Sequence, residues 1–201
     1  MTVSDFDKIH QYDSIEKPYG YSYGEWTTKW WNWIMSISKE KSPLLDEKGN
    51  DWFQNQPRAD VWFLIGNFAT NASKYKIFPQ RNVRLEAGRS ILFPVLNCLA
   101  TFLEYPHLKT PADLLDHVCK DVGSVVKKDL IINRKMYEPI RIQSEPEIFK
   151  LIIPEDNAFD IKNSGLTDAA ADGYWVFLKP LSKGSYRIEF EGSCENGKLS
   201  A

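Results

Sequence analysis

The most regular pattern of apolar and polar positions lies between Ser22 and Ser38, and it predicts an amphipathic helix at residues 23–38. Ser22 and Glu25 have the spacing of a capping box, a typical helix start. At 100° per residue, bulky apolar side chains form one narrow stripe and polar side chains lie opposite. The stripe comprises Trp26, Trp30, Trp33 and Ile37. Burying this stripe would make the helix a main anchor of the core.

Two further apolar side chains of this segment fall beside the stripe. Trp31 lies about 120° from its centre, and Met35 follows one turn later. We expect the main core to leave this pair uncovered. An N-terminal arm, residues 1–21, would cover part of the patch with tyrosine rings, and a ligand or a partner would cover the rest.

A second helix is predicted at residues 111–128. Thr110 is a suitable N-cap, Pro111 suits the first helical position, and the lysines at 127 and 128 suit the C-terminal carbonyl groups. Elsewhere, short apolar or alternating runs bounded by turn residues predict strands. The predicted strands are residues 61–65, 75–78, 83–85, 90–97, 130–132, 137–142, 147–153, 173–178 and 185–190.

This series of short strands with two helices indicates a mainly β, α+β chain. We expect an antiparallel β-sandwich of Greek-key or jelly-roll type, forming a single domain at residues 22–201 after the arm. The polar segment 155–172 is predicted to be a long loop, with a turn at Asp172.

Three strands have a predicted place in the sheets. The continuous apolar run 61–65 is expected to be a central strand buried on both faces. Pro94 cannot donate a backbone hydrogen bond, so its strand should lie at an edge or contain a bulge there. Residues 185–190 should form the last hairpin with 173–178 and lie near an open sheet edge, because no strand pattern follows them.

Composition and charge exclude several classes of function. The chain has 201 residues, with 25 Lys and Arg against 27 Asp and Glu, and a formal net charge of −2. There is no basic stripe for nucleic acid, and no apolar run approaches the roughly 20 residues that span a bilayer. The N-terminus lacks a signal-peptide pattern. As given, the sequence predicts a cytoplasmic protein, or an exported one whose leader is absent; no pattern specifies its oligomeric state.

Residue types and spacings predict no metal site and no cofactor. Asp113 and His117 share a helical i, i+4 spacing, but two ligands are too few, since zinc requires three or four. The cysteines are widely spaced, without a Cys-x-x-Cys motif, and are expected to be free thiols. They are Cys98, Cys119 and Cys194. A Gly-x-Ser-x-Gly nucleophile motif is also absent from the sequence.

Two kinds of candidate site remain. Tyr23, Trp31 and Trp52 are aromatic residues among polar neighbours, and exposed rings bind sugars or anchor partner proteins. They predict a non-catalytic binding module whose partner is a carbohydrate or a protein. Alternatively, Glu25 and Asp172 lie in aromatic-rich segments that favour acid/base roles. Held about 5–10 Å apart in a cleft, they would serve a glycosidase-like hydrolase, whereas burial apart from one another would favour the module.

Four segments of the chain carry distinctive motifs. They read YSYGEWTTKWWNW at residues 21–33, VWFLIG at 61–66, AGRSILFPVLN at 87–97 and ADGYWVFLKPL at 171–181. Together they resemble an uncharacterised family of microbial proteins, mostly hypothetical and often carrying export signals, over residues 20–192. The resemblance implies no activity. It implies export and one further strand beyond Gly197.

Overall fold

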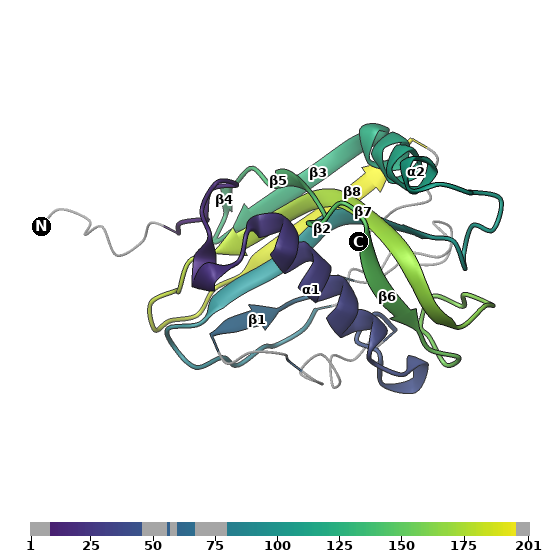
Figure 1. Ribbon diagram of the computed structural model, residues 1–201. Coiled ribbons are helices and arrows are strands. Elements are labelled where there is room, and N and C mark those ends of the chain that lie inside the picture. Colours follow the sequence, from purple (N-terminus) through teal and green to yellow (C-terminus); the bar gives the residue numbers. More distant parts are fainter. Residues whose placement is uncertain (1–8, 46–55, 57–59, 67–79, 196–201) are drawn as a thin grey trace, which may run out of the picture.

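The computed structural model describes residues 9–45, 56, 60–66 and 80–195 (Figure 1). This part of the chain is mainly β and contains two α-helices and eight strands in two sheets. In chain order they are α1 (Tyr23–Met35), β1 (Val61–Phe63), β2 (Ser90–Thr101), α2 (Pro111–Gly123), β3 (Val125–Ile132), β4 (Lys135–Met136), β5 (Ile140–Gln143), β6 (Phe149–Ile153), β7 (Gly165–Leu178) and β8 (Ile188–Cys194). The predicted α+β class, with two helices, is confirmed.

The larger sheet is built around β7. This strand pairs antiparallel with β2 on one side, and with β5 and then β6 on the other. β1 pairs with β2 in the parallel direction, so the sheet is mixed rather than antiparallel. A smaller sheet has the order β4-β3-β8.

Helix α1 begins where the capping box predicts and lies across one face of the larger sheet (Figure 1). Ser22 Oγ accepts from the Glu25 N–H at 3.1 Å, and Glu25 Oε2 accepts from the Ser22 N–H at 2.7 Å. The helix ends at Met35, before the predicted end at residue 38. The predicted stripe is buried in the core under the helix, with Trp26, Trp30, Trp33 and Ile37 each at most 4% exposed.

The prediction that Trp31 and Met35 form an uncovered patch is wrong. Trp31 is 1% exposed and Met35 is 2% exposed. The Trp31 ring lies 5.2 Å from the ring of Trp30 and 6.0 Å from that of Phe159, in the connection between β6 and β7. That connection brings Phe159 against the flank of the helix, and the helical pattern alone could not indicate this.

The N-terminal arm covers a different part of α1. Its residues 9–21 run along the end of β7, where the Tyr12 N–H donates to Phe177 O at 2.8 Å. The rings of Tyr19 and Tyr21 then pack edge-on against Trp26, at 6.2 and 5.5 Å. The arm therefore completes the core at the beginning of the helix.

Helix α2 and the smaller sheet cover the other face of β7. α2 packs Leu114, Val118 and Val122 against Ala170. β3 packs Leu130 and Ile132 against the cluster that contains Val176 and Leu178 of β7.

Helix α2 stops at Gly123, not at residue 128 as predicted. Gly123 and the β-branched pair Val125 and Val126 shortly after it disfavour the helix. Lys127 and Lys128 instead pair with Ser193 and Gly192 of β8.

Several strand predictions are also corrected. Residues 165–172 belong to β7 rather than to a loop, because Asp168 and Asp172 are matched by cations on the neighbouring strands. Residues 173–178 and 185–190 do not form a hairpin, since β8 pairs with β3 in the other sheet. β1 is the last described strand of its sheet rather than a central one. No strand forms at 83–85, and the predicted strand 75–78 lies outside the described residues.

Two predictions about strand position are confirmed. The register between β2 and β7 shifts between Pro94 and Leu96, which is the predicted irregularity at the proline. β8 pairs only with β3 in the described part of the chain, so it lies at a sheet edge.

The burial of Trp31 generates a stability prediction. Trp31→Ala should lower the free energy of unfolding by about 3–5 kcal/mol, as much as Trp30→Ala, because both side chains are fully enclosed. Ile15→Ala, at an 86% exposed position, is the control and should change it by less than about 0.5 kcal/mol. Urea unfolding of the three variants measures these differences. A cost below about 1 kcal/mol for Trp31→Ala would contradict its place in the core.

Candidate functional site

The structure does not bring the two predicted carboxylates together. Glu25 is held in the first turn of α1 by the Ser22 N–H. Asp172 follows Ala171, which belongs to the core under α1, so the alternation of strand side chains directs Asp172 to the opposite face. There it contacts Arg141, which also reaches Cys119 O of α2. The sheet separates Glu25 from Asp172.

Two of the predicted aromatic contact residues are part of the core. Tyr23 and Trp31 are each 1% exposed. The Tyr23 ring lies edge-on against Phe177 at 5.6 Å. Neither ring is available to stack on a sugar or to fill a partner's pocket. Trp52, the remaining aromatic candidate, lies outside the described residues.

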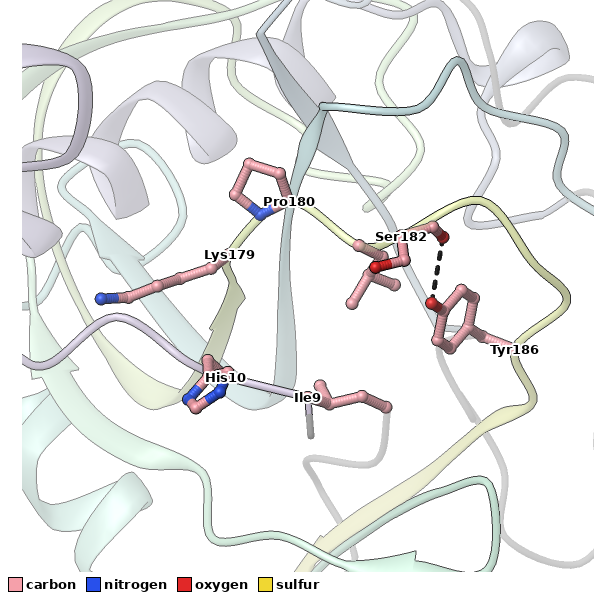
Figure 2. A pocket seen from close by; sticks show the side chains of 7 residues that line it. Ile9, His10, Lys179, Pro180, Ser182 and Tyr186 are labelled. Atoms are coloured by element: carbon pink, nitrogen blue, oxygen red, sulfur yellow. Dashed lines mark hydrogen bonds between the residues drawn. The ribbon is translucent and has the colours of Figure 1, made fainter. Parts of the chain in front are cut away.

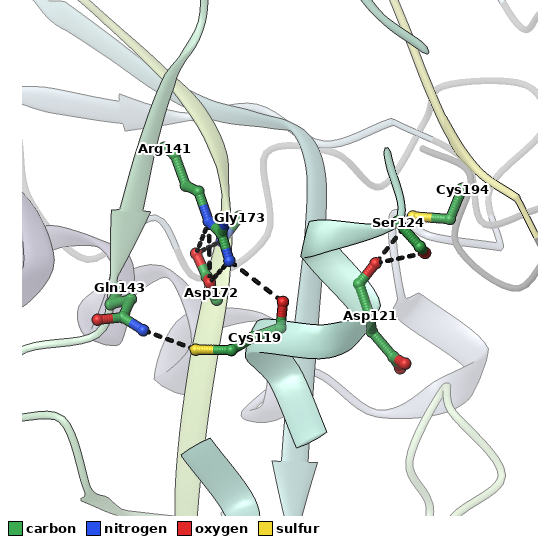
Figure 3. Close-up of polar contacts among 8 residues, drawn as sticks. All are labelled: Cys119, Asp121, Ser124, Arg141, Gln143, Asp172, Gly173 and Cys194. Carbon is green, nitrogen blue, oxygen red and sulfur yellow. Dashed lines mark hydrogen bonds and ion pairs between the residues drawn. The ribbon is translucent and has the colours of Figure 1, made fainter. Parts of the chain in front are cut away.

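Asp172 and Arg141 form an ion pair beneath α2, in which the carboxylate is buried and the Arg141 side chain is 40% exposed (Figure 3). The Asp172 carboxylate has no exposed surface, and it accepts from Arg141 Nη2 at 2.7 Å, from Arg141 Nε at 3.1 Å and from the Gly173 N–H at 2.7 Å. The hydrogen bonds to Asp172 raise the pKa of Arg141. Arg141 Nη2 also donates to Cys119 O at 3.2 Å. The pair therefore fastens the last turns of α2 to β5 and β7.

The cysteines line the same side of the sheet as free thiols. Cys119 Sγ accepts from Gln143 Nε2 at 2.9 Å (Figure 3). Cys98 Sγ donates to Asp121 Oδ2 at 3.7 Å, and Cys194 Sγ donates to Asp121 O at 3.3 Å. Burial raises the pKa of all three thiols, so the surroundings disfavour the thiolate that nucleophilic chemistry requires.

A cluster of titratable groups lies between the turn after β2 and helix α2. The ring of Tyr105 lies 4.3 Å from that of His117, and His117 Nε2 lies 3.6 Å from Asp121 Oδ2. Burial raises the pKa of Glu104 to about 7. Burial and the charge of Glu104 raise the pKa of Tyr105.

Asp113 and His117, which share an i, i+4 spacing on α2, each contact other groups. Asp113 caps the start of α2, accepting from the Thr110 N–H at 2.8 Å and the Lys109 N–H at 2.9 Å. Its hydrogen bonds to the Lys109 and Thr110 backbone lower the pKa of Asp113. Among the residues that the structure describes, no group of three or more potential ligands could hold a metal ion.

A small cavity of about 110 Å³ lies where the arm meets the connection between β7 and β8 (Figure 2). The Lys179 N–H donates to His10 O at 2.9 Å, and Tyr186 Oη donates to Ser182 O at 3.0 Å. Figure 2 shows Tyr186 directed at Ser182 on one side, with His10 and Ile9 on the other. The volume is well below the ~300 Å³ at which small-molecule sites begin.

The free side of β6 has backbone groups without a strand partner. In the described part of the chain, β6 pairs only with β7. Since hydrogen bonds along an antiparallel strand point alternately to its two sides, part of the β6 backbone is directed away from β7. Ile152 is 65% exposed, and Leu166, directly opposite it on β7, is 66% exposed.

On the face of β7 that carries Leu166, helix α2 and the smaller sheet cover the later residues but do not reach Leu166 and Ile152. Val176 and Leu178 pack in the cluster with the smaller sheet, and Ala170 packs under α2. Leu166 projects from the same face but is exposed, so the beginning of β7 extends beyond α2 and the smaller sheet. The predicted strand 147–153 contains Ile152, but the sequence prediction did not assign its side chains to a buried and an exposed face. The alternation of Lys150 and Ile152 with buried neighbours was the available signal.

Comparison with known proteins reveals no relative. No family model matches the chain, and neither a curated protein nor a solved structure is significantly similar to it. Among the described residues, no helix combines the length and the apolar content needed to cross a bilayer. The function must therefore be argued from the geometry.

The ion pair of Arg141 and Asp172 generates a second prediction. Arg141→Met should lower the free energy of unfolding by about 2–3 kcal/mol, because Asp172 would remain buried without its cation; the loss is smaller than for a fully buried pair, since the Arg141 side chain is 40% exposed. Adding Asp172→Asn should recover part of that loss. Lys150→Met, which breaks the more exposed pair with Asp168, should cost at most about 1 kcal/mol. Strictly additive losses in the Arg141 and Asp172 double-mutant cycle, measured by urea unfolding, would show that the two side chains are not coupled.

Glu104 generates a pH-dependent prediction. Its pKa rises from 4.5 to about 7 on folding, so the folded chain retains a proton that the unfolded chain loses in this range. The stability that it contributes is present below pH 4.5 and is lost as the pH rises to about 7. The melting temperature of Glu104→Gln, minus that of the unmodified chain, should therefore increase as the pH rises from 4.5 to about 7. Above pH 7 this difference should stay constant. Since part of Glu104 is exposed, the gain is reduced by solvent screening. If the melting temperatures of Glu104→Gln and the unmodified chain differ by the same amount at every pH from 4 to 8, the raised pKa of Glu104 is contradicted.

Proposed function

We propose that this protein is a binding module that takes up an extended polypeptide segment along the free side of β6. In strand addition, the bound segment completes the backbone hydrogen bonds of the edge strand, while side chains on alternate positions provide specificity. The observation that carries the proposal is the exposed cross-strand pair of Ile152 and Leu166 at this edge.

Ordinary surface chemistry does not account for this pair. Single exposed apolar side chains are common, but edge strands are usually protected by charges, prolines or bulges. The one charged side chain of β6 is Lys150, which lies 2.6 Å from Asp168 in an ion pair. The ion pair offsets part of the Lys150 charge at the edge, and the two aliphatic side chains lie next to it.

The strand is held in place from its other face. Phe149, Leu151 and Ile153 belong to the core cluster under α1. At the beginning of α1, a side chain on Gly24 would come within 2.7 Å of Gln143 O, so only glycine allows the helix to pack this closely on the connection between β5 and β6. A fixed edge lowers the entropy cost of binding, because the strand need not order when the partner arrives.

A protein partner has more support than a carbohydrate or a hydrolysed substrate. Tyr23 and Trp31, the rings predicted to stack on sugars, are buried. Glu25 and Asp172 are each held by other groups, on opposite faces of the sheet. An open strand offers backbone groups, which an extended polypeptide complements.

We further propose that the two sheets form the layers of a β-sandwich with α2 inserted beside them. The support is the shared cluster of β3 and β7 side chains, including Leu130 and Val176. In this arrangement the bound segment would extend the larger layer.

The proposed function is tested by a charge placed on the edge. In a selection from a displayed library of random 12-residue peptides, the chain should enrich sequences with alternating apolar residues. Ile152→Asp should weaken binding of an enriched peptide by about tenfold or more, because the apolar contact is lost and a charge is desolvated. Val126→Asp, at a 63% exposed position on β3, is the matched control and should bind like the unmodified chain.

Isothermal titration measures the affinities, and backbone amide NMR shifts locate the site. Shifts concentrated at residues 149–153 would support strand addition. Enriched peptides that bind equally well to Ile152→Asp, or that shift amides elsewhere, would exclude this edge as the binding site.

A further inference from the structure

We infer that the segment bound at β6 carries basic residues on both sides of an apolar, alternating core. This inference rests on the proposed function and adds the chemistry of the partner. Exposed carboxylates flank the strand at both ends: Glu145 and Glu147 precede it, and Glu155 and Asp156 follow it. Ser22 Oγ donates to Glu145, and in the described part of the chain Glu147, Glu155 and Asp156 take part in no ion pair.

Among the residues that the structure describes, the cations around the edge leave this negative charge largely uncompensated. Lys150 is paired with Asp168, and Lys39 is paired with Asp160. Lys162 is exposed in the connection to β7 and offsets at most one of the flanking charges. A groove or edge with charge of one sign attracts partners of the opposite sign and repels those of the same sign.

The same charges argue against a second copy of this chain as the partner. In an antiparallel pair of β6 strands centred on Leu151, Glu147 of each copy would lie opposite Glu155 of the other. In a parallel pair in register, each glutamate would face its own counterpart. Like charges directly opposite each other destabilise paired strands. The edge is therefore suited to a different chain.

The spacing of the charges sets the length of the partner segment. Glu147 and Glu155 stand on either side of the five residues of β6. Because both strands rise about 3.4 Å per residue, an extended segment that reaches both glutamates carries its basic residues about eight positions apart. The apolar residues between them should occur at every second position, on the face of Ile152 and Leu166.

Two synthetic peptides test this inference on the full chain. Both have the same core of alternating valine and threonine, and one has two lysines at each end where the other has two glutamates. We expect the lysine-flanked peptide to bind about tenfold or more tightly at low salt. The difference should shrink at about 0.3 M NaCl, where the Debye length is roughly half its value of about 10 Å at 0.1 M.

Charge reversal on the protein supplies the control. Glu147→Lys with Glu155→Lys should reverse the preference between the two peptides. Asp116→Lys, an exposed carboxylate on α2, makes the same kind of charge change away from the edge and should leave the preference unchanged.

The possible failures are distinguishable. If both peptides bind equally at all salt concentrations and Ile152→Asp weakens both, strand addition stands and the basic partner is excluded. If neither peptide binds to the chain or to its charge-reversed variant, the inference and the proposed function both fail. If sedimentation shows self-association that Ile152→Asp abolishes, the partner is a second copy and the inference is wrong.

Discussion

The tryptophan-rich face of α1 can be buried only above a strand whose own side chains leave room for it, and the rest of the fold depends on this constraint. β7 meets it with Ala169 and Ala171 under the helix, followed by Trp175, whose ring packs 5.4 Å from that of Trp30. Gly173 lies between them. A side chain there would come within 2.7 Å of Leu96 O, so only glycine lets β2 and β7 approach this closely. β7 thus becomes the strand on which both faces of the sheet are organised.

On its other face β7 carries a group that is costly to bury. Removing the Asp172 carboxylate from water is unfavourable unless a cation and further donors compensate it, and Arg141 and the Gly173 N–H do so. Since Arg141 also reaches Cys119 O, this compensation fixes α2 over the sheet. With α1 on one face and α2 on the other, the described part of the chain leaves the beginning of β7 and its neighbour β6 accessible. The proposed binding edge therefore lies where the packing of the two helices on the sheet ends.

Local signals predicted the parts of the fold that depend on neighbouring residues. The capping box at Ser22 and the irregularity at Pro94 are examples, because each follows from contacts within a few residues. The burial of Trp31 depends on Phe159, which is far away in the sequence, so helical periodicity could not predict it. The first half of β7 was predicted to be a loop, because Asp168 and Asp172 are typical loop residues when their cationic partners are not known. The candidate site was missed for a related reason. The amino-acid composition of a strand does not indicate which of its two edges lacks a hydrogen-bonded neighbouring strand.

The accessibility of β6 is the central claim, and amide hydrogen exchange of the unliganded full chain tests it most directly. Amides that donate to β7 should be protected, whereas those pointing to the free side should exchange at rates close to those of exposed loops. The account predicts alternation of slow and fast amides along residues 149–153. Uniform protection of all five amides in a monomeric sample would show that another part of the chain already covers the edge, and would contradict the account.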